Sequence, residues 1–318
     1  MGRRPRLAVT LGDPRGIGPE IVGKMLKDGR APRVADIVVV GPTGTEVDVA
    51  EPVGAWPRGG SPALAGELAG RQVERAVLLA RAGTVDGVVT APIDKSVLLK
   101  GGYDYPGHTE MLAALTGSTV AMMLTSADSG ERKTGNMTPA DVRSPSGALR
   151  VVLATMHLAL RDVPAALTRE RIVSVVSTTR AGLRDWFGVA EPRIALCALN
   201  PHAGDQGRFG TEDDELLAPA AKECGALGPF PADTVFVRAM KGEFDAVVAP
   251  YHDVGMTAIK VAAFGHAVNV TLGLPFPRTS PDHGTALDIA SKGMADASSM
   301  IAATLLCAGI ASRVRSHA

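Results

Sequence analysis

Residues 6–20 read RLAVTLGDPRGIGPE, and this stretch decides the fold class because a short apolar run leads through a glycine-rich turn into a helix. The apolar run Arg6–Leu11 is typical of a buried strand. The turn has the spacing G-x-x-x-G-x-G, which differs both from the G-x-G-x-x-G dinucleotide fingerprint and from a P-loop. The stretch therefore predicts a strand, a tight turn and a helix, and does not by itself indicate a cofactor.

The same alternation of strand and helix patterns continues along the chain. Further apolar runs rich in β-branched residues are 36–40, 85–90, 120–124, 151–155, 193–199, 244–249 and 268–272. Helical periodicity separates them, for example at Val73, Ala76, Val77 and Ala80, and again after Thr168, which is a suitable N-cap. The pattern predicts an α/β protein with a mostly parallel sheet. Residues 44–62 and 126–147 are expected to be irregular loops.

Length and composition limit the remaining classes. A chain of 318 residues is larger than one core usually supports, so we expect two lobes. Lys plus Arg and Asp plus Glu number 33 each, which argues against a nucleic-acid partner. Hydrophobic residues make up 46% and aromatic residues only 4%, a composition that suits a parallel sheet built from Ala, Val, Leu and Ile.

The cysteines and apolar stretches predict a cytoplasmic protein. Cys197, Cys224 and Cys307 are widely spaced, so neither a disulfide framework nor a cysteine metal site is indicated. The apolar run near the N-terminus is too short for a signal peptide. The longest apolar stretch, 300–311, is shorter than the roughly 20 residues that cross a bilayer, so no membrane partner is expected.

Three histidines follow predicted strands directly. His157, His202 and His252 come just after the runs 151–155, 193–199 and 244–249. Open α/β sheets bind their ligands at the carboxyl ends of strands, so these imidazoles are expected to converge on one divalent metal ion. Three imidazoles favour zinc, with Mg, Mn or Co as alternatives, and leave positions open for a substrate. Each histidine alone is more often a structural residue.

Several residues are candidates for binding a phosphate. Thr109 lies in PGHTE, residues 106–110, ahead of a helical pattern, where amide groups and a hydroxyl bind anions readily. The simpler alternative is an ordinary N-cap. Lys260 and Arg278 offer positive charge, although taken singly each is more often a solvated surface residue. A serine hydrolase is not indicated, because no G-x-S-x-G sequence occurs.

Long strings of the sequence resemble one family, the 4-hydroxythreonine-4-phosphate dehydrogenase (PdxA) family, over nearly the whole chain. The strings are GDPRGIGPE at 12–20, TAPIDK at 90–95, GHTE at 107–110, LNPHAGDQGRFG at 199–210, PADTVF at 231–236, YHDVG at 251–255 and NVTLGLPFPRTSPDHGTALDIASKG at 269–293. The resemblance implies a two-lobed α/β/α fold like that of the isocitrate and isopropylmalate dehydrogenases, with the active site in the interlobe cleft. Approximate lobes are 1–118 plus 256–318, and 119–255.

The resemblance also implies roles for individual residues. His157, His202 and His252 match metal ligands, with one ligand lent by the partner subunit of a homodimer. The residues that match the family's substrate contacts are His108, Thr109, Lys260, Asn269 and Arg278. Asp253 and Lys260 are the catalytic candidates, Asp253 either relaying a proton or orienting His252. By similarity to the decarboxylating dehydrogenases, His283, Gly284, Thr285 and Asp288 are candidates for binding NAD, with NADP as the alternative.

The implied activity is metal- and NAD-dependent oxidation and decarboxylation of a small phosphorylated hydroxy acid. One substrate is 4-hydroxy-L-threonine 4-phosphate, which yields 3-amino-2-oxopropyl phosphate for pyridoxal phosphate biosynthesis. Alternatives are D-threonate or D-erythronate 4-phosphate, which yield dihydroxyacetone phosphate, and a non-catalytic metal-binding paralogue. Departures from the family pattern at Val254, at Asp205-Gln206 and at 156–160 leave the choice of substrate open.

Overall fold

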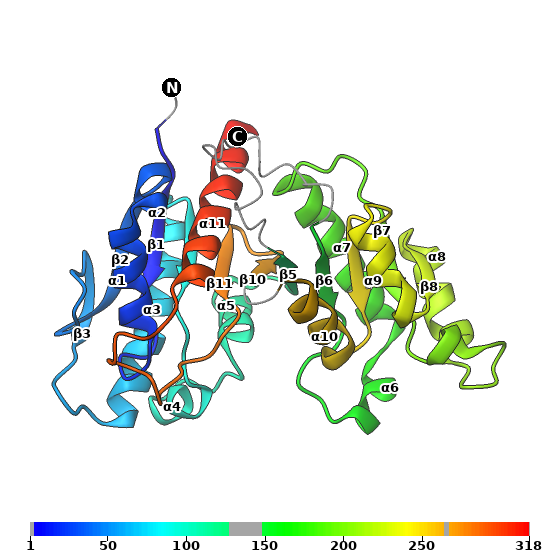
Figure 1. Cartoon of the computed structure of the whole chain (residues 1–318), viewed down its shortest axis with the longest axis horizontal. Helices are drawn as coiled ribbons and strands as arrows, with labels where there is room; N and C mark the ends of the chain where they lie inside the picture. The colour runs from blue at the N-terminus through cyan, green and yellow to red at the C-terminus, as the bar shows by residue number, and fades with distance from the viewer. Residues whose placement is uncertain (1–2, 127–147, 264–266, 318) are drawn as a thin grey trace. The chain divides into compact units, whose positions relative to one another are not determined.

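The computed structural model describes residues 3–126, 148–263 and 267–317 (Figure 1). The chain divides into two compact units. Unit 1 comprises residues 1–118 and 268–318, and unit 2 comprises residues 119–267. Sequence analysis placed the second boundary between residues 255 and 256, whereas the helix that contains both residues, α10 (His252–Ala263), lies wholly in unit 2.

Unit 1 is built on strands in the order β3-β2-β1-β4-β11-β10. The strands are β1 (Arg6–Thr10), β2 (Asp36–Thr43), β3 (Glu51–Ala55), β4 (Gly87–Thr90), β10 (Ala267–Leu272, whose first residue belongs to unit 2) and β11 (Arg278–Pro281). All neighbours run parallel except β10 and β11. Its helices are α1 (Gly18–Asp28), α2 (Arg30–Val34), α3 (Pro62–Arg81), α4 (Lys95–Lys100), α5 (His108–Thr116) and α11 (Ser298–His317). Helix α3 packs on β1 and β2, and α11 packs on β4 and β11.

A buried glutamine fixes the turn after β1. Gln72 on α3 accepts hydrogen bonds from the amides of Leu11 and Gly12 at 2.8 and 3.0 Å, and donates to the carbonyl of Gly12 at 2.9 Å. Gly12 has a φ of 69°, a left-handed conformation that glycine adopts without a steric penalty. The side chain of one helix thus sets where α1 begins.

Unit 2 has the strand order β5-β6-β9-β7-β8. The strands are β5 (Ala121–Ser126), β6 (Arg150–Leu153), β7 (Ile194–Cys197), β8 (Leu227–Phe230) and β9 (Ala246–Ala249). Only the pair β5 and β6 is antiparallel. The helices are α6 (Val163–Ala166), α7 (Arg169–Asp185), α8 (Ala218–Cys224), α9 (Ala232–Met240) and α10, with short helical turns at Leu160–Asp162, Pro201–Gly204 and Asp213–Leu217. Val151, Val247 and Ala195 belong to one buried cluster of its core.

Most of the expected elements are confirmed. Each of the eight apolar runs contains a strand, the periodic segment at 73–80 lies in α3, and Thr168 caps α7 by accepting a hydrogen bond from the amide of Arg171. The expectation of an irregular loop over 44–62 is wrong in part, because strand β3 lies within it. Residues 127–147 of the other expected loop lie outside the described residues.

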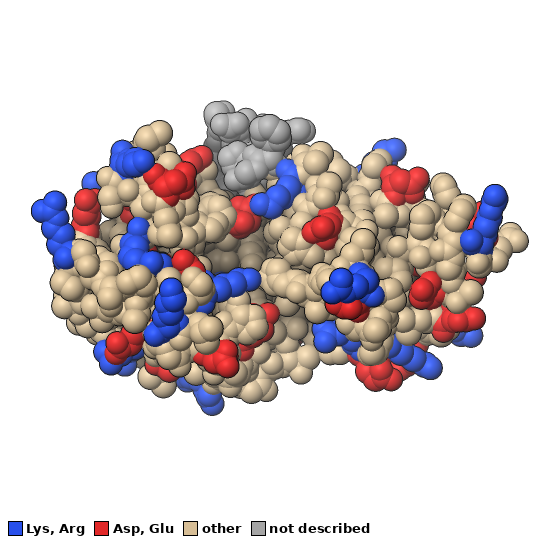
Figure 2. Space-filling view, turned by 90° about the horizontal axis from the view of Figure 1, so that it is seen from below, with Lys and Arg blue, Asp and Glu red and all other residues tan. Residues whose placement is uncertain are grey.

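The charges on the surface and the lengths of the apolar helices agree with what the composition indicates. On the face shown in Figure 2, basic and acidic side chains are interspersed and do not gather by sign. Within the described residues, no helix is both long enough and apolar enough to cross a membrane.

Candidate active site

A buried arginine is the central feature of unit 1. Arg278 begins β11, between β4 and β10, with Val88 of β4 as its register partner. The simpler expectation, that this residue is a solvated surface charge, is wrong. The side chain is only 1% exposed, although arginine is almost never fully buried without a charged partner.

Two threonine hydroxyls hold the guanidinium of Arg278. Nη1 donates to Oγ1 of Thr271 on β10 at 2.9 Å, and Nη2 donates to Oγ1 of Thr90 at the end of β4. Nε is buried and has no hydrogen-bond partner, and no carboxylate forms an ion pair with this arginine, among the residues that the structure describes. Burial lowers the pKa of Arg278 to about 10, so the group is still a cation at neutral pH. The described residues therefore leave the buried positive charge of Arg278 without a counter-ion.

The first turn of α5 lies close to this charge. His108 is the first residue of the helix, and its Nε2 atom is buried without a hydrogen-bond partner in the described part of the chain. Burial, and then the positive charge of Arg278, hold the pKa of His108 well below 6.5, so the imidazole is neutral. Thr109 is buried inside the helix, and Gly107 is the N-cap. The alternative reading of Thr109 as an N-cap is therefore wrong.

Asn269 lies on the same face of the sheet as Arg278. It pairs with Ser280 in the β10–β11 register, two residues from Arg278, and side chains two residues apart on a strand share a face. Its Oδ1 atom is buried without a hydrogen-bond partner among the described residues. Unit 1 thus gathers four of the five expected substrate contacts. Buried polar atoms that lack partners favour a ligand as their partner.

Lys260, the fifth expected contact, lies in unit 2 near the end of α10 and is exposed. The three predicted metal ligands lie in the same unit. His157 follows β6, His202 follows β7 and His252 follows β9, and these strands are parallel neighbours. The histidines therefore all follow the carboxyl edge of the sheet, as the sequence predicted.

Two of the three imidazoles are brought together. The ring centroids of His157 and His252 lie 5.4 Å apart, whereas the ring of His202 lies against Phe209 with centroids 6.3 Å apart. Among the described residues, no group of three or more His, Cys, Asp or Glu side chains is arranged to hold a metal ion. The chain gathers a pair of nitrogen donors.

The backbone at two of these histidines is strained. His157 has a φ of 46° and His202 a φ of 54°, in the left-handed region that few residues other than glycine adopt. Such residues cluster at active sites, where the surrounding structure holds them in place. The turn containing His202 is held by Asp213, a fully buried carboxylate that accepts hydrogen bonds from the amides of Leu199 and Asn200 at 2.8 and 2.9 Å.

Asp253 is exposed and contacts the neighbouring imidazole. Its Oδ1 atom lies 2.7 Å from Nδ1 of His252, and this contact favours the tautomer with a proton on Nδ1. Nε2 of His252 is then the ring atom with a lone pair. The geometry agrees with an orienting role for Asp253.

The candidate nucleotide loop is anchored to the turn before α1. The amide of Ile17 donates to the carbonyl of Thr285 at 2.9 Å, and a Cβ at Gly16 would lie 2.8 Å from that oxygen. His283 has a buried Nε2 atom without a partner in the described part of the chain, while Gly284 and Asp288 are exposed. A backbone hydrogen bond thus connects the loop at 283–288 with the glycine-rich turn before α1, although the two segments are far apart in sequence.

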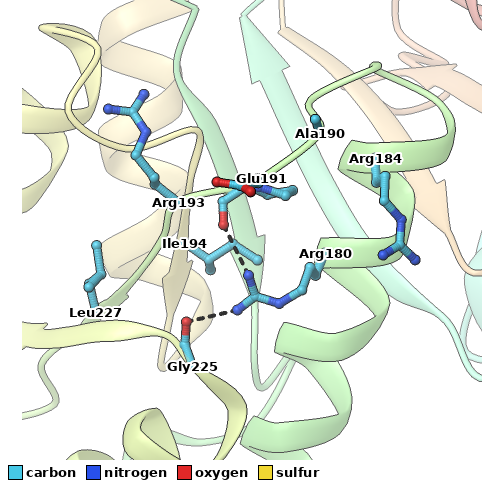
Figure 3. Close-up of a pocket in the computed structure, with 9 residues that line it drawn as sticks. Arg180, Arg184, Ala190, Glu191, Arg193, Ile194, Gly225 and Leu227 are labelled. Atoms are coloured by element: carbon cyan, nitrogen blue, oxygen red, sulfur yellow. Dashed lines mark hydrogen bonds between the residues drawn. The ribbon is translucent and has the colours of Figure 1, made fainter.

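One pocket of about 380 Å³ lies in unit 2, away from the three histidines of that unit (Figure 3). It is lined at the start of β7 and β8 by Arg193, Ile194 and Leu227, whereas the histidines follow the opposite ends of the strands. Its arginines have partners within the protein: Arg180 donates to the carbonyl of Gly225, and Arg193 pairs with Asp245. This pocket is not the candidate site.

Sequence reasoning did not find Thr90, Thr271 or Asp213. Thr271 shares the parity of Asn269 on its strand, and Thr90 is the last residue of its strand. Those two features were the available signals. Neither reveals the hydrogen bonds to Arg278, because these depend on which strands are neighbours.

Comparisons with known proteins identify the family of the chain. Residues 26–307 match the family model of the pyridoxal phosphate biosynthetic protein PdxA. A 4-hydroxythreonine-4-phosphate dehydrogenase of Stenotrophomonas maltophilia is 38% identical, over 97% of this chain and 98% of that protein. A Bradyrhizobium diazoefficiens protein, provisionally named a D-threonate 4-phosphate dehydrogenase, is 39% identical over 93% and 94%.

Solved structures give the same result. The 4-hydroxythreonine-4-phosphate dehydrogenase of Klebsiella pneumoniae aligns with a TM-score of 0.78 and 37% identity, covering 98% of this chain and 99% of that chain. An isocitrate dehydrogenase of Methylococcus capsulatus aligns with a TM-score of 0.52 and 18% identity, covering 98% and 88%, which confirms the expected likeness in fold. With a family model that covers most of its length and relatives above 35% identity, this chain belongs to the PdxA family.

Proposed function

We propose that this protein is a dehydrogenase that oxidises a phosphorylated four-carbon hydroxy acid with NAD and a divalent metal ion, and that the oxidised acid loses CO₂. The first candidate substrate is 4-hydroxy-L-threonine 4-phosphate, with 3-amino-2-oxopropyl phosphate as the product. Its relatives of known name support a dehydrogenase of this class.

The observation that carries the proposal is the buried charge of Arg278. Leaving an unpaired cation in the interior is unfavourable unless an anion completes the site. A phosphate matches the planar fork of a guanidinium with two parallel hydrogen bonds. The hydroxyl of Thr109 and the neutral imidazole of His108 lie on the same helix and supply further polar contacts. We assign these groups to the phosphate end of the substrate.

The imidazole pair supports a metal site. Nitrogen donors of His157 and His252 suit zinc, with Mg, Mn or Co as alternatives, and a pair leaves ligand positions for the substrate hydroxyl and a third imidazole. We propose that His202 of a partner subunit supplies the third imidazole in a homodimer. When bound, the ion would lower the pKa of the hydroxyl and stabilise negative charge on the oxygen as CO₂ leaves.

The residues of the chain have distinct tasks in this scheme. Asp253 holds Nδ1 of His252 and so directs Nε2 toward a ligand. His108 is neutral, so it donates or accepts a hydrogen bond without adding a second cation beside Arg278. Lys260 remains a candidate for binding the substrate or transferring a proton. Asn269 offers its Oδ1 atom, which accepts no hydrogen bond from the described residues.

For the cofactor we propose the loop at 283–288. The carbonyl of Thr285 is tied to the turn before α1, so the loop is already positioned, and His283, Gly284 and Asp288 are arranged along it. NAD would accept the hydride from the substrate carbon; NADP is the alternative.

A direct assay tests the proposal. The reduction of NAD and of NADP is followed by the absorbance of the reduced nicotinamide with 4-hydroxy-L-threonine 4-phosphate, with and without added zinc, and CO₂ release is measured in parallel. We expect both signals in a one-to-one ratio, with loss of both after chelation. Reduction without CO₂ release would contradict the decarboxylation, and activity that survives complete metal removal would contradict the metal.

A second candidate function is the oxidation of D-threonate or D-erythronate 4-phosphate to dihydroxyacetone phosphate. The provisionally named Bradyrhizobium relative favours it, because its identity of 39% is as high as the 38% of the Stenotrophomonas hydroxythreonine phosphate enzyme. The same assay with these two acids decides, since the larger kcat/KM identifies the substrate. If no acid is oxidised although metal binds, the chain is the non-catalytic paralogue.

A further inference from the structure

Among the groups that touch Arg278, two have no place in the proposed chemistry. Thr90 and Thr271 come from the strands on either side of β11, and each gives one hydroxyl oxygen to one terminal nitrogen of the guanidinium. The contacts are fully buried. A threonine hydroxyl is a neutral acceptor, so it directs the donor without cancelling its charge.

The alternative way to hold a buried guanidinium is a carboxylate, and it has a different consequence. A carboxylate in either position would form a salt bridge, and the arginine would then offer little net charge to an anion. Glu110 is the acidic group whose charge favours the cation, and it makes no ion pair with Arg278 among the described residues. The choice of two hydroxyls therefore fixes the direction of the group and keeps its charge.

Counting donors shows what is left for a ligand. A guanidinium has five N–H groups, and the threonines use two of them. Nε and one hydrogen on each terminal nitrogen remain, and Nε has no partner in the described part of the chain. These donors lie in one plane, and its orientation is fixed because the two terminal nitrogens are held by separate strands.

We propose that Thr90 and Thr271 are positioning residues for anion recognition: they orient Arg278 for the substrate's phosphate while leaving its charge uncompensated. This inference rests on the proposed function, in which Arg278 binds that phosphate. The threonines act through the arginine and take no part in bond breaking.

The strand itself supplies a matched control. Thr279 is the next residue after Arg278, its side chain is also fully buried, and its hydroxyl donates to the carbonyl of Ala303 at 2.8 Å. Adjacent residues of a strand point to opposite faces, so Thr279 lies on the face of α11 and away from the arginine's hydroxyl partners. Thr279→Val removes a buried hydroxyl hydrogen bond from the same strand without touching the guanidinium.

The experiment measures binding and kinetics for Thr90→Val, Thr271→Val, Thr279→Val and Arg278→Met. Inorganic phosphate, titrated calorimetrically, is the probe for binding, and kcat and KM are measured with the phosphorylated acid. Loss of one hydrogen bond changes an equilibrium by roughly a factor of 2 to 10, so we expect each of the first two variants to weaken phosphate binding and raise KM by about that factor, with kcat within about twofold of wild type. Thr90→Ser and Thr271→Ser should restore both values.

The outcomes separate this inference from the proposed function. If Arg278→Met loses phosphate binding while Thr90→Val and Thr271→Val bind as wild type, the positioning role is wrong and the proposed function stands. If Arg278→Met binds phosphate as well as wild type, the phosphate assignment itself fails. An equal rise of KM in Thr279→Val would show that loss of stability, and not orientation of the arginine, causes the effect, and would overturn the inference.

Discussion

The two units hold their candidate groups in opposite ways. In unit 1 the charged group is buried and fixed by neighbouring strands before any ligand binds. In unit 2 two imidazoles approach each other, while a third lies against Phe209, and two of the three histidines have a left-handed backbone. The difference teaches that the proposed anion contact is built into the secondary structure, whereas the proposed metal contact depends on turns that bring together only two of the three candidate imidazoles among the described residues.

Removal of one imidazole gives the largest expected effect. His252→Ala should lower kcat/KM by more than about 100-fold, because loss of a direct ligand should exceed the 10- to 100-fold effects typical of groups that only support a ligand. Its thermal stability should stay close to that of the metal-free wild type. Metal content by mass spectrometry is the measurement, and an undiminished content in His252→Ala, His157→Ala and His202→Ala would remove the histidines from the metal site.

Replacement of Arg278 should separate function from stability. Arg278→Met should lower kcat/KM for the phosphorylated acid by about thirty-fold or more, since losing a desolvated charge contact costs roughly 2–5 kcal/mol. The free energy of unfolding should be equal to or above that of wild type, because an apolar side chain of similar length replaces a buried unpaired charge.

The dephosphorylated acid is the control for Arg278→Met. Its kcat/KM should change little, because it lacks the group that the arginine binds. Equal losses on both acids would place Arg278 at the carboxylate or the cofactor.

Mixing two variants should show whether a partner subunit supplies the third imidazole of the proposed metal site. Because His157 and His252 lie together in one chain, a mixture of His202→Ala with His252→Ala should recover about a quarter of wild-type activity, as half of the dimers are mixed and each has one intact site. A mixture of His157→Ala with His252→Ala should recover none. Recovery in the second mixture alone would contradict the pairing seen in the chain, provided that subunit exchange is verified by mass.

The pH dependence of stability is the smallest expected effect. The pKa of His108 is lowered by folding, so below its unfolded value near 6.5 the unfolded chain binds more protons, and the free energy of unfolding falls as the pH decreases. His108→Asn should flatten the dependence between pH 6.5 and 5. Chemical denaturation at several pH values measures it, and an unchanged slope would contradict the neutral, buried imidazole.

The sequence predicted the strands and helices better than it predicted the side-chain contacts at the candidate site. The eight apolar runs each contain a strand because continuous β-branched runs are a strong signal of a buried parallel sheet. The burial of Arg278 was not foreseen, because a single basic residue is more often solvated and three prolines surround it in PFPRTSP. Strand β3 was missed because EPVGA contains a proline and a glycine, which are uncommon in strands. The positions of His157, His202 and His252 after strands followed from the pattern. Their unequal distances could not, since they depend on the turns.

The anchoring of the loop at 283–288 has a consequence for evolution of the chain. One backbone hydrogen bond ties Thr285 to Ile17, and the absence of a side chain at Gly16 makes room for that contact. Every residue at position 285 supplies a carbonyl, and every residue except proline at position 17 supplies an amide, so most substitutions at these two positions leave the bond intact. Gly16 has no such freedom, because any Cβ would meet the carbonyl oxygen. The three residues at this contact therefore tolerate substitution unevenly, and the strictest constraint falls on Gly16, which has no side chain.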